Sequence, residues 1–272
     1  MKLYFPFSIL MLSLLLGACS HISDYDQHMN KANNYYIGND MQNAEKEFQI
    51  CVKINPRNYH AYIQLAGVKL YQGDFKSSEN YFDKCLSIDS GCSLAYYGKA
   101  EMEELNGNTL SAIKNLEKAT LIKKDFFLAF FLKARLERNI EHFGEAIQDF
   151  DAAINLKSDY YLLYSFRGNC YYKLKNYSKA LTDFNTVIKY LPHDASAYVS
   201  RGCALGNIKN YTEANASFDK AISINKEYIS AYLNKGYFEN LSGQKDLACI
   251  DFSYAQKIDT AKANPYIRLY CK

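Results

Sequence analysis

Residues 161–194 read YLLYSFRGNCYYKLKNYSKALTDFNTVIKYLPHD, and residues 195–228 read ASAYVSRGCALGNIKNYTEANASFDKAISINKEY. Aligned without a gap, the two stretches share Tyr at position 4, Gly at position 8, Ala at position 20 and Phe at position 24. Recurrence at a fixed period of this length is the sequence signature of a repeat architecture. The same register extends in both directions along the chain.

The repeat runs from Tyr25 to Lys262 as seven units of 34 residues, with no insertion or deletion. The units begin at Tyr25, Tyr59, Ser93, Phe127, Tyr161, Ala195 and Ile229. Position 8 is always small, with the residues Ala32, Ala66, Ala100, Ala134, Gly168, Gly202 and Gly236. Position 20 is small too, with Ala44, Ser78, Ala112, Ala146, Ala180, Ala214 and Ala248. Position 24 is large, with Phe48, Phe82, Leu116, Phe150, Phe184, Phe218 and Phe252.

These columns predict pairs of antiparallel helices. Small residues at positions 8 and 20 let two helix axes approach closely, whereas bulky side chains would hold them apart. The large residue at position 24 and the ring at position 4 would fill the space between neighbouring pairs. Apolar positions recur at helical spacings of three and four, as in Ala248, Phe252 and Ala255. The turn residues Gly73 and Gly107 fall between the two helices of a unit.

The pattern resembles the tetratricopeptide repeat, and the resemblance covers residues 25–262. It implies an all-α fold: a right-handed α-solenoid of seven helix-turn-helix units. Residues 263–272 carry Ile267 and Tyr270 behind Pro265, which predicts a short C-terminal capping helix on the seventh unit. The first unit departs from the family pattern, because His28 stands where an aromatic residue is usual. Its first helix is therefore expected to fray.

The resemblance also implies where a partner binds. In this family, side chains of the first helices line a concave groove that takes a protein or peptide ligand. Carried over to this chain, the groove residues are Tyr36, Ile63, Leu70, Tyr97, Glu101, Glu104, Phe131, Arg135, Arg138, Asn169, Tyr172 and Tyr237. The pair Arg135 and Arg138 could hold an acidic peptide. The alternative, which we favour, is that these arginines neutralise Glu101 and Glu104 one unit earlier.

The N-terminus resembles a bacterial lipoprotein signal peptide. Lys2 precedes a mostly apolar run from Leu3 to Leu16 that is short for a membrane-spanning helix. Residues 16–19 read LGAC, similar to a lipobox, which implies cleavage of residues 1–18 and lipidation of Cys19. Residues 19–24 would then be a short tether. Because Ser20 rather than Asp follows the cysteine, the resemblance implies sorting to the outer membrane. We expect a lipid-anchored protein that faces the periplasm.

The sequence offers no catalytic, metal or cofactor motif. No His, Cys, Asp or Glu set has metal-ligand spacing, and no Gly-rich phosphate loop is found. The net charge of +3 is too small to predict a nucleic-acid partner. We therefore expect no enzyme activity, no cofactor, no metal and no small-molecule substrate.

The cysteines divide into two groups. Cys51 and Cys85 occupy a small-residue column and are interpreted as buried packing residues. Cys249 lies in the last unit and Cys271 in the proposed cap, where an oxidising periplasm would permit a disulfide. The spacing alone leaves a bridge and two free thiols both open.

The leading functional hypothesis is a membrane-anchored scaffold or adaptor that mediates protein–protein interactions in the bacterial cell envelope. One alternative is an assembly lipoprotein similar to the pilotins that carry secretin subunits. A third is an enzyme or glycan-binding protein that acts on the cell wall. The repeats look alike in the first two cases, so the sequence does not separate them.

Overall fold

The computed structural model describes residues 23–271, and within this range it contains fifteen helices and no strand. The predicted signal peptide and the lipidation site Cys19 lie outside the described residues. The chain divides into two compact halves, an N-terminal half that ends at Ala129 and a C-terminal half that begins at Phe130. Among the described helices, none is long and apolar enough to cross a membrane.

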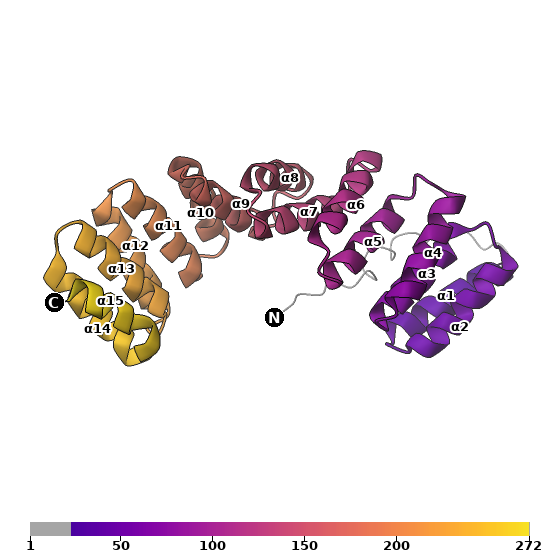
Figure 1. Cartoon of the computed structure of the whole chain (residues 1–272), viewed down its shortest axis with the longest axis horizontal. Coiled ribbons are helices and arrows are strands. Elements are labelled where there is room, and N and C mark those ends of the chain that lie inside the picture. Colours follow the sequence, from indigo (N-terminus) through magenta and orange to yellow (C-terminus); the bar gives the residue numbers. More distant parts are fainter. Residues whose placement is uncertain (1–22, 272) are drawn as a thin grey trace. The chain divides into compact units, whose positions relative to one another are not determined.

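The helices alternate between first and second helices of successive repeats (Figure 1). The first helices are α1 (Asp24–Ile37), α3 (Tyr59–Tyr71), α5 (Ser93–Leu105), α7 (Phe127–Asn139), α9 (Leu162–Lys173), α11 (Ala195–Asn207) and α13 (Ile229–Leu241). The second helices are α2 (Met41–Ile54), α4 (Phe75–Ile88), α6 (Thr109–Ile122), α8 (Phe143–Leu156), α10 (Tyr177–Tyr190), α12 (Tyr211–Ile224) and α14 (Lys245–Ile258). This arrangement confirms the predicted all-α helical-repeat solenoid.

A final helix, α15 (Thr260–Tyr270), packs on α14 and α13. It begins before Ala263, where the predicted cap begins, because the Asp259 side chain accepts a hydrogen bond from the Lys262 N–H and caps the helix there. Pro265 lies inside the helix rather than ahead of it. The C-terminal end is held by a disulfide between Cys249 on α14 and Cys271, so the bridge is formed in this structure.

The turn inside each repeat places one residue at positive φ. Three of these residues are glycines, Gly73, Gly107 and Gly243, for which this conformation carries no steric penalty. The other four positions are Asn39, Glu141, Lys175 and Lys209. The residue that follows the positive-φ residue caps the second helix in several repeats, as Asp40 does for the Asn43 N–H.

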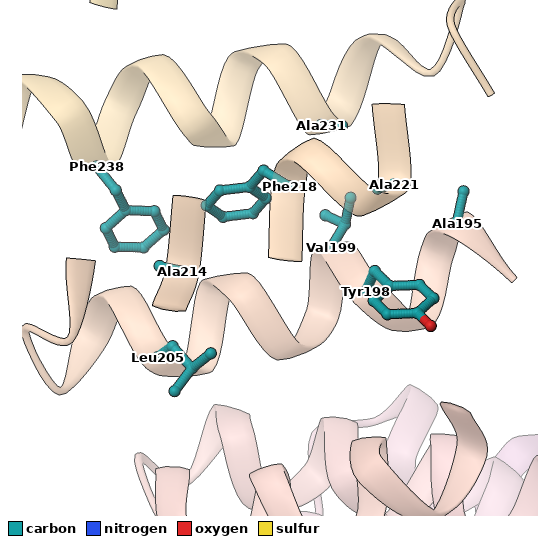
Figure 2. Packing of buried hydrophobic residues seen from close by; sticks show 9 residues of the cluster. All are labelled: Ala195, Tyr198, Val199, Leu205, Ala214, Phe218, Ala221, Ala231 and Phe238. Carbon is teal, nitrogen blue, oxygen red and sulfur yellow. The ribbon is translucent and has the colours of Figure 1, made fainter. Parts of the chain in front are cut away.

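The predicted core columns form the interior. Every phenylalanine at position 24 is at most 2% exposed, and the alanines at positions 8 and 20 are fully buried. Figure 2 shows the cluster around Phe218, whose ring stacks on Phe238 from the next repeat with the ring centroids 6.0 Å apart. An added Cβ at Gly202 would lie 2.6 Å from Phe218, so only glycine lets this ring come so close.

The tyrosines at position 4 tie the linkers between repeats to the following helix. The hydroxyl of Tyr62 donates to the carbonyl of Pro56, and Tyr198 donates to Pro192 in the same way, each at 3.3 Å. Tyr164 and Tyr232 bond the carbonyls six residues before them at 3.0 and 3.2 Å. The rings therefore fill space as predicted, and their hydroxyls also satisfy linker carbonyls.

The first helix is not frayed, contrary to expectation. α1 is continuous from Asp24 to Ile37, with Ser23 as its N-cap. His28 Nδ1 lies 2.5 Å from Glu47 Oε2 on α2, and Lys31 Nζ lies 2.5 Å from the other oxygen of the same carboxylate. The contacts of His28 and Lys31 with Glu47 thus connect α1 to α2 in place of the missing aromatic ring. Hydrogen bonds from Lys31 and then His28 hold the pKa of Glu47 below its usual range.

Candidate partner-binding surface

The predicted groove residues differ in how much of each side chain a partner could touch. Ile63 is fully buried and Tyr97 is 6% exposed, so their assignment to a binding surface is wrong. Ile63 packs in a core cluster with Phe82 and Ala95, because this position of α3 faces α4 and α5. Tyr97 packs against the ring of Phe126, with the centroids 5.2 Å apart. The fifth position of a repeat therefore contributes to the core in these units.

In the N-terminal half, four predicted residues remain accessible. Tyr36 and Leu70 are half-buried near the ends of α1 and α3, and Glu101 and Glu104 are half-buried on α5. Burial raises the pKa of Tyr36, and the nearby charge of Glu101 adds to the effect. Side chains from α1 and α5 therefore share one face of this half. The Tyr97 hydroxyl donates to Glu101 Oε1 at 3.1 Å.

In the C-terminal half, Phe131 and Arg138 are half-buried and engaged with α9. The ring of Phe131 stacks on Phe166 with the centroids 6.0 Å apart. The guanidinium of Arg138 lies 4.5 Å from the centre of the same Phe166 ring, and its Nη2 donates to Asn139 at 3.1 Å. Burial lowers the pKa of Arg138. The predicted pairing of Arg135 and Arg138 with Glu101 and Glu104 stays a prediction.

The last three first helices, α9, α11 and α13, and the final helix α15 present a row of aromatic and polar side chains. Asn207 Nδ2 donates to the Tyr172 hydroxyl at 3.0 Å, which joins α11 to α9. Tyr237 on α13 lies edge-on to Tyr270 on α15, with the centroids 6.3 Å apart. Burial raises the pKa of Tyr172, with further contributions from Cys203 and Tyr237. We call Tyr172, Cys203, Asn207, Tyr237 and Tyr270 the aromatic row.

Of the aromatic row, only Tyr172 and Tyr237 were predicted from the sequence. Cys203 and Asn207 on α11 were not among the predicted groove residues. Tyr270 was placed in the cap, and its proximity to Tyr237 depends on how α15 packs on α13. Asn169 is exposed, but its amide donates to the Ser165 carbonyl of its own helix at 2.9 Å.

The chemistry of the aromatic row suits an uncharged segment of a protein. Its members carry phenol hydroxyls, an amide and apolar ring surface, and none carries a formal charge at neutral pH; burial raises the pKa of Cys203 to about 12. Tyrosine combines a large apolar contact area with a hydrogen-bonding tip, which is why it is enriched at protein interfaces. The row can therefore supply apolar contact and hydrogen bonds together.

A separate open pocket of about 360 Å³ lies between α8, α9 and α10. It is lined by Asp151, Asn155, Arg167, Tyr171, Lys179, Thr182 and Asp183. None of the predicted groove residues is among them. Arg167 bonds both Asp183 and Asp151, and Lys179 lies 5.2 Å from the centre of the Tyr171 ring. Arg167 and its two carboxylate partners thus link α8, α9 and α10.

Arg167 belongs to a ladder of ion pairs that the sequence analysis did not identify. The cation at position 7 reaches the acid at position 23 of its own repeat in Lys31–Glu47, Lys133–Asp149, Arg167–Asp183 and Lys235–Asp251. It reaches the second helix of the preceding repeat in Lys99–Asp83, Arg167–Asp151 and Lys235–Asp219. The sequence carried a signal for these pairs, because Lys or Arg recurs at position 7 and acidic residues recur at positions 23 and 25 in several repeats.

Two repeats add a second buried carboxyl to this ladder. Glu137 and Asp149 flank Lys133, and Glu239 and Asp251 flank Lys235 in the same positions of the seventh repeat. Burial, reinforced by Asp149, raises the pKa of Glu137 to about 8. Burial and Asp251 raise that of Glu239 to about 7. Glu137 and Glu239 therefore keep their protons to a higher pH than an exposed glutamate does.

Among residues 23–271, no group of three or more His, Cys, Asp or Glu side chains is placed to hold a metal ion.

Comparisons with known proteins agree with this geometry. Tetratricopeptide repeat family models match residues 59–92, 161–194 and 195–228, which are the second, fifth and sixth repeats. Three of the seven predicted units therefore match tetratricopeptide repeat models. No curated protein matches its sequence.

Solved structures show the same fold. The C-terminal part of a TPR repeat-containing protein from Cytophaga hutchinsonii is similar with a TM-score of 0.70 and 17% identity, over 87% of this chain and 98% of that one. YrrB, described as a TPR protein with an unusual peptide-binding site, has a TM-score of 0.63 and 22% identity, over 68% of this chain and 95% of its own. A tetratricopeptide repeat protein from Parabacteroides merdae has a TM-score of 0.56 and 18% identity, over 91% of this chain and 99% of its own.

Proposed function

We propose that this tetratricopeptide-repeat chain is a lipid-anchored scaffold of the bacterial cell envelope that binds a segment of another protein through its first helices. The repeat fold supports a protein–protein interaction scaffold, and proteins of this type bind peptide or protein partners. The single observation that carries the binding proposal is the aromatic row. Its side chains come from the successive first helices α9, α11 and α13 and from the final helix α15, and they remain partly accessible.

The partner segment is expected to be uncharged and rich in apolar side chains where it meets the aromatic row. Tyr172, Asn207 and Tyr237 offer hydrogen bonds and ring surface but no charge to pair with an acidic or basic ligand. YrrB, with which the chain shares its fold, has a peptide-binding site, and this gives a precedent for a peptide ligand on such repeats.

Site-specific photocrosslinking tests the binding surface. A photoreactive phenylalanine analogue replaces Tyr237 on α13 in one strain and Tyr254 on α14 in a control strain. Tyr254 is 49% exposed and stacks on Tyr232, so it offers a comparable tyrosine on a second helix. We expect a discrete crosslinked protein from the Tyr237 position that is absent from the Tyr254 position. The same product from both positions, or none from Tyr237, would contradict the assignment.

The anchor is supported by the lipobox-like segment LGAC at residues 16–19 and by the short tether that follows it. More than one acyl chain on a single cysteine gives stable membrane binding, because each buried methylene contributes about 0.8 kcal/mol. Metabolic labelling with a palmitate analogue should mark the wild-type chain and not a Cys19→Ala variant. Equal labelling of both chains would remove the anchor from the proposal and leave the binding surface untouched.

A further inference from the structure

Two buried cysteines lie together at the junction of the second and third repeats, within the N-terminal half. Cys85 is in the last turn of α4, and Cys92 is the residue before α5. Cys85 is fully buried and Cys92 is 5% exposed, and both belong to one core cluster. Both thiols are free in this structure, and their membership of one cluster places the two side chains in the same buried region. Cys92 was not considered in the sequence analysis, where Cys85 was interpreted as a packing residue alone.

The backbone holds the two sulfurs in this arrangement. The N–H of Asp89 donates to the Cys85 carbonyl at 2.9 Å, and the N–H of Cys92 donates to the Asp89 carbonyl at 3.1 Å. Gly91 also donates to the Asp89 side chain at 2.9 Å. These bonds fold the short linker back on itself, so that Cys92 returns to the helix turn that carries Cys85. The Cys92 side chain makes no capping hydrogen bond to α5.

We propose that Cys85 and Cys92 are the site of a second disulfide, which joins α4 to α5 when the chain folds in an oxidising environment. The C-terminal half provides the precedent, because Cys249 and Cys271 are bridged there. The proposal does not depend on the partner or on the lipid anchor, since it concerns the chain's own thiols and a disulfide oxidant.

The chemistry is a thiol–disulfide exchange with a low-molecular-weight disulfide such as oxidised glutathione. Either thiol can react first once it has lost its proton, and the balance is the same if Cys92 is the first attacking group. Its thiolate attacks one glutathione sulfur and releases one glutathione thiolate. The Cys85 sulfur then loses its proton, attacks the Cys92 sulfur and releases the second glutathione. The two cysteines together lose two protons and two electrons, and the oxidant becomes two thiols.

Because both sulfurs are buried, the timing of this reaction depends on when an oxidant can reach them. With both sulfurs enclosed by Tyr62, Phe82 and Ala95, an oxidant reaches them before α5 packs on α4, or when this junction opens. Oxidation is therefore expected during refolding and to be slow on the folded, reduced protein.

Peptide mapping tests the proposal on the wild-type protein. The mature chain is refolded in a glutathione redox buffer, its remaining thiols are alkylated under denaturing conditions, and it is digested. Trypsin leaves both cysteines in one peptide, residues 85–99, because no Lys or Arg lies between them. A protease that cuts before Asp89 separates the two cysteines unless a disulfide joins them. The bridge between Cys249 and Cys271 serves as the internal standard for oxidation.

We expect residues 85–99 to appear unalkylated and lighter by two hydrogen atoms than the reduced peptide, with the fragments on either side of Asp89 still joined. A Cys92→Ser variant should show an alkylated Cys85 in the same buffer. If Cys249 and Cys271 are bridged while Cys85 and Cys92 are both alkylated, the proposal is overturned. A disulfide from either residue to Cys51 or Cys170 would overturn it as well.

Discussion

Arg167 and Asp183 form a bidentate ion pair between α9 and α10. Nε of the arginine donates to one carboxylate oxygen at 2.9 Å, and Nη2 donates to the other at 2.6 Å. Asp183 is 2% exposed, and the remaining arm of Arg167 reaches Asp151 on the second helix of the preceding repeat at 2.6 Å. One side chain on α9 therefore connects α8 and α10. The stability of the C-terminal half should depend on it more than on a surface ion pair.

Arg167→Met should lower the free energy of unfolding by about 3–5 kcal/mol, because it leaves the Asp183 carboxylate buried without a partner. Arg201→Met is the matched control. Arg201 holds the same position in the next repeat, where position 23 is Ser217 and the nearest acid, the exposed Glu213, lies 4.0 Å away. The control should lose less than about 1 kcal/mol. Urea unfolding followed by circular dichroism measures both, and equal losses would contradict the special role of Arg167.

Gly202→Ala should destabilise the chain by about 1–3 kcal/mol, because the added Cβ would lie 2.6 Å from the fully buried ring of Phe218. Gly144→Ala is the control, since a Cβ added there meets nothing within 4 Å and alanine favours the helix. The control should leave the melting temperature unchanged or raise it. If the two variants melt alike, the close contact between Gly202 and Phe218 is not present in solution.

Stability should fall as pH rises from about 5 to about 8. The pKa values of Glu137 and Glu239 are about 8 and about 7 in the folded chain, against an ordinary value of 4.5. The folded state thus binds more protons than the unfolded state in this range. The stabilisation is complete below the unfolded pKa and is lost as pH passes the folded pKa. The slope is at most about 1.4 kcal/mol per pH unit for each group.

The double variant Glu137→Gln/Glu239→Gln should flatten this pH dependence, because the amides carry no charge at any pH. The groups that face these carboxyls are Lys133 and Asp149 in the fourth repeat. In the seventh repeat they are Lys235, Asp251 and Asp219. Glu145→Gln on the exposed surface of α8 is the control and should keep the wild-type slope. The denaturant midpoint of each variant is measured across the pH range. If the double variant keeps the wild-type dependence of stability on pH, that dependence comes from other groups.

Reduction of the bridge between Cys249 and Cys271 should release α15. The disulfide closes a segment of 22 residues, and its loss should cost about 3 kcal/mol in the unfolding free energy. Hydrogen exchange should show weaker protection in residues 260–270, because only noncovalent contacts with α14 remain, among them the packing of Phe252 against Tyr266 and Tyr270. Cys249→Ser should show the same loss without reductant. A helix α15 that stays protected in the variant would mean that packing alone secures it.

The sequence by itself determined the repeat. The 34-residue period, the small residues at positions 8 and 20 and the ring at position 24 are local constraints, since helical spacing places them on one face of a helix. In the second, third, fourth, sixth and seventh repeats, the first helix begins at the residue where the predicted unit begins. His28 was misjudged because its partner Glu47 lies on the other helix of the hairpin.

Only the tertiary structure decided which side chains a partner could reach and which buried groups meet. Ile63 and Tyr97 share the position of the half-buried Phe131, yet they are enclosed by their own neighbouring helices. Cys85 lies in the same buried cluster as Cys92, which precedes the next helix, and Arg167 on α9 pairs with Asp183 on α10. Such contacts depend on how one helix is rotated and tilted on the next. Those angles result from the packing of all side chains at an interface, and no single column of the repeat encodes them.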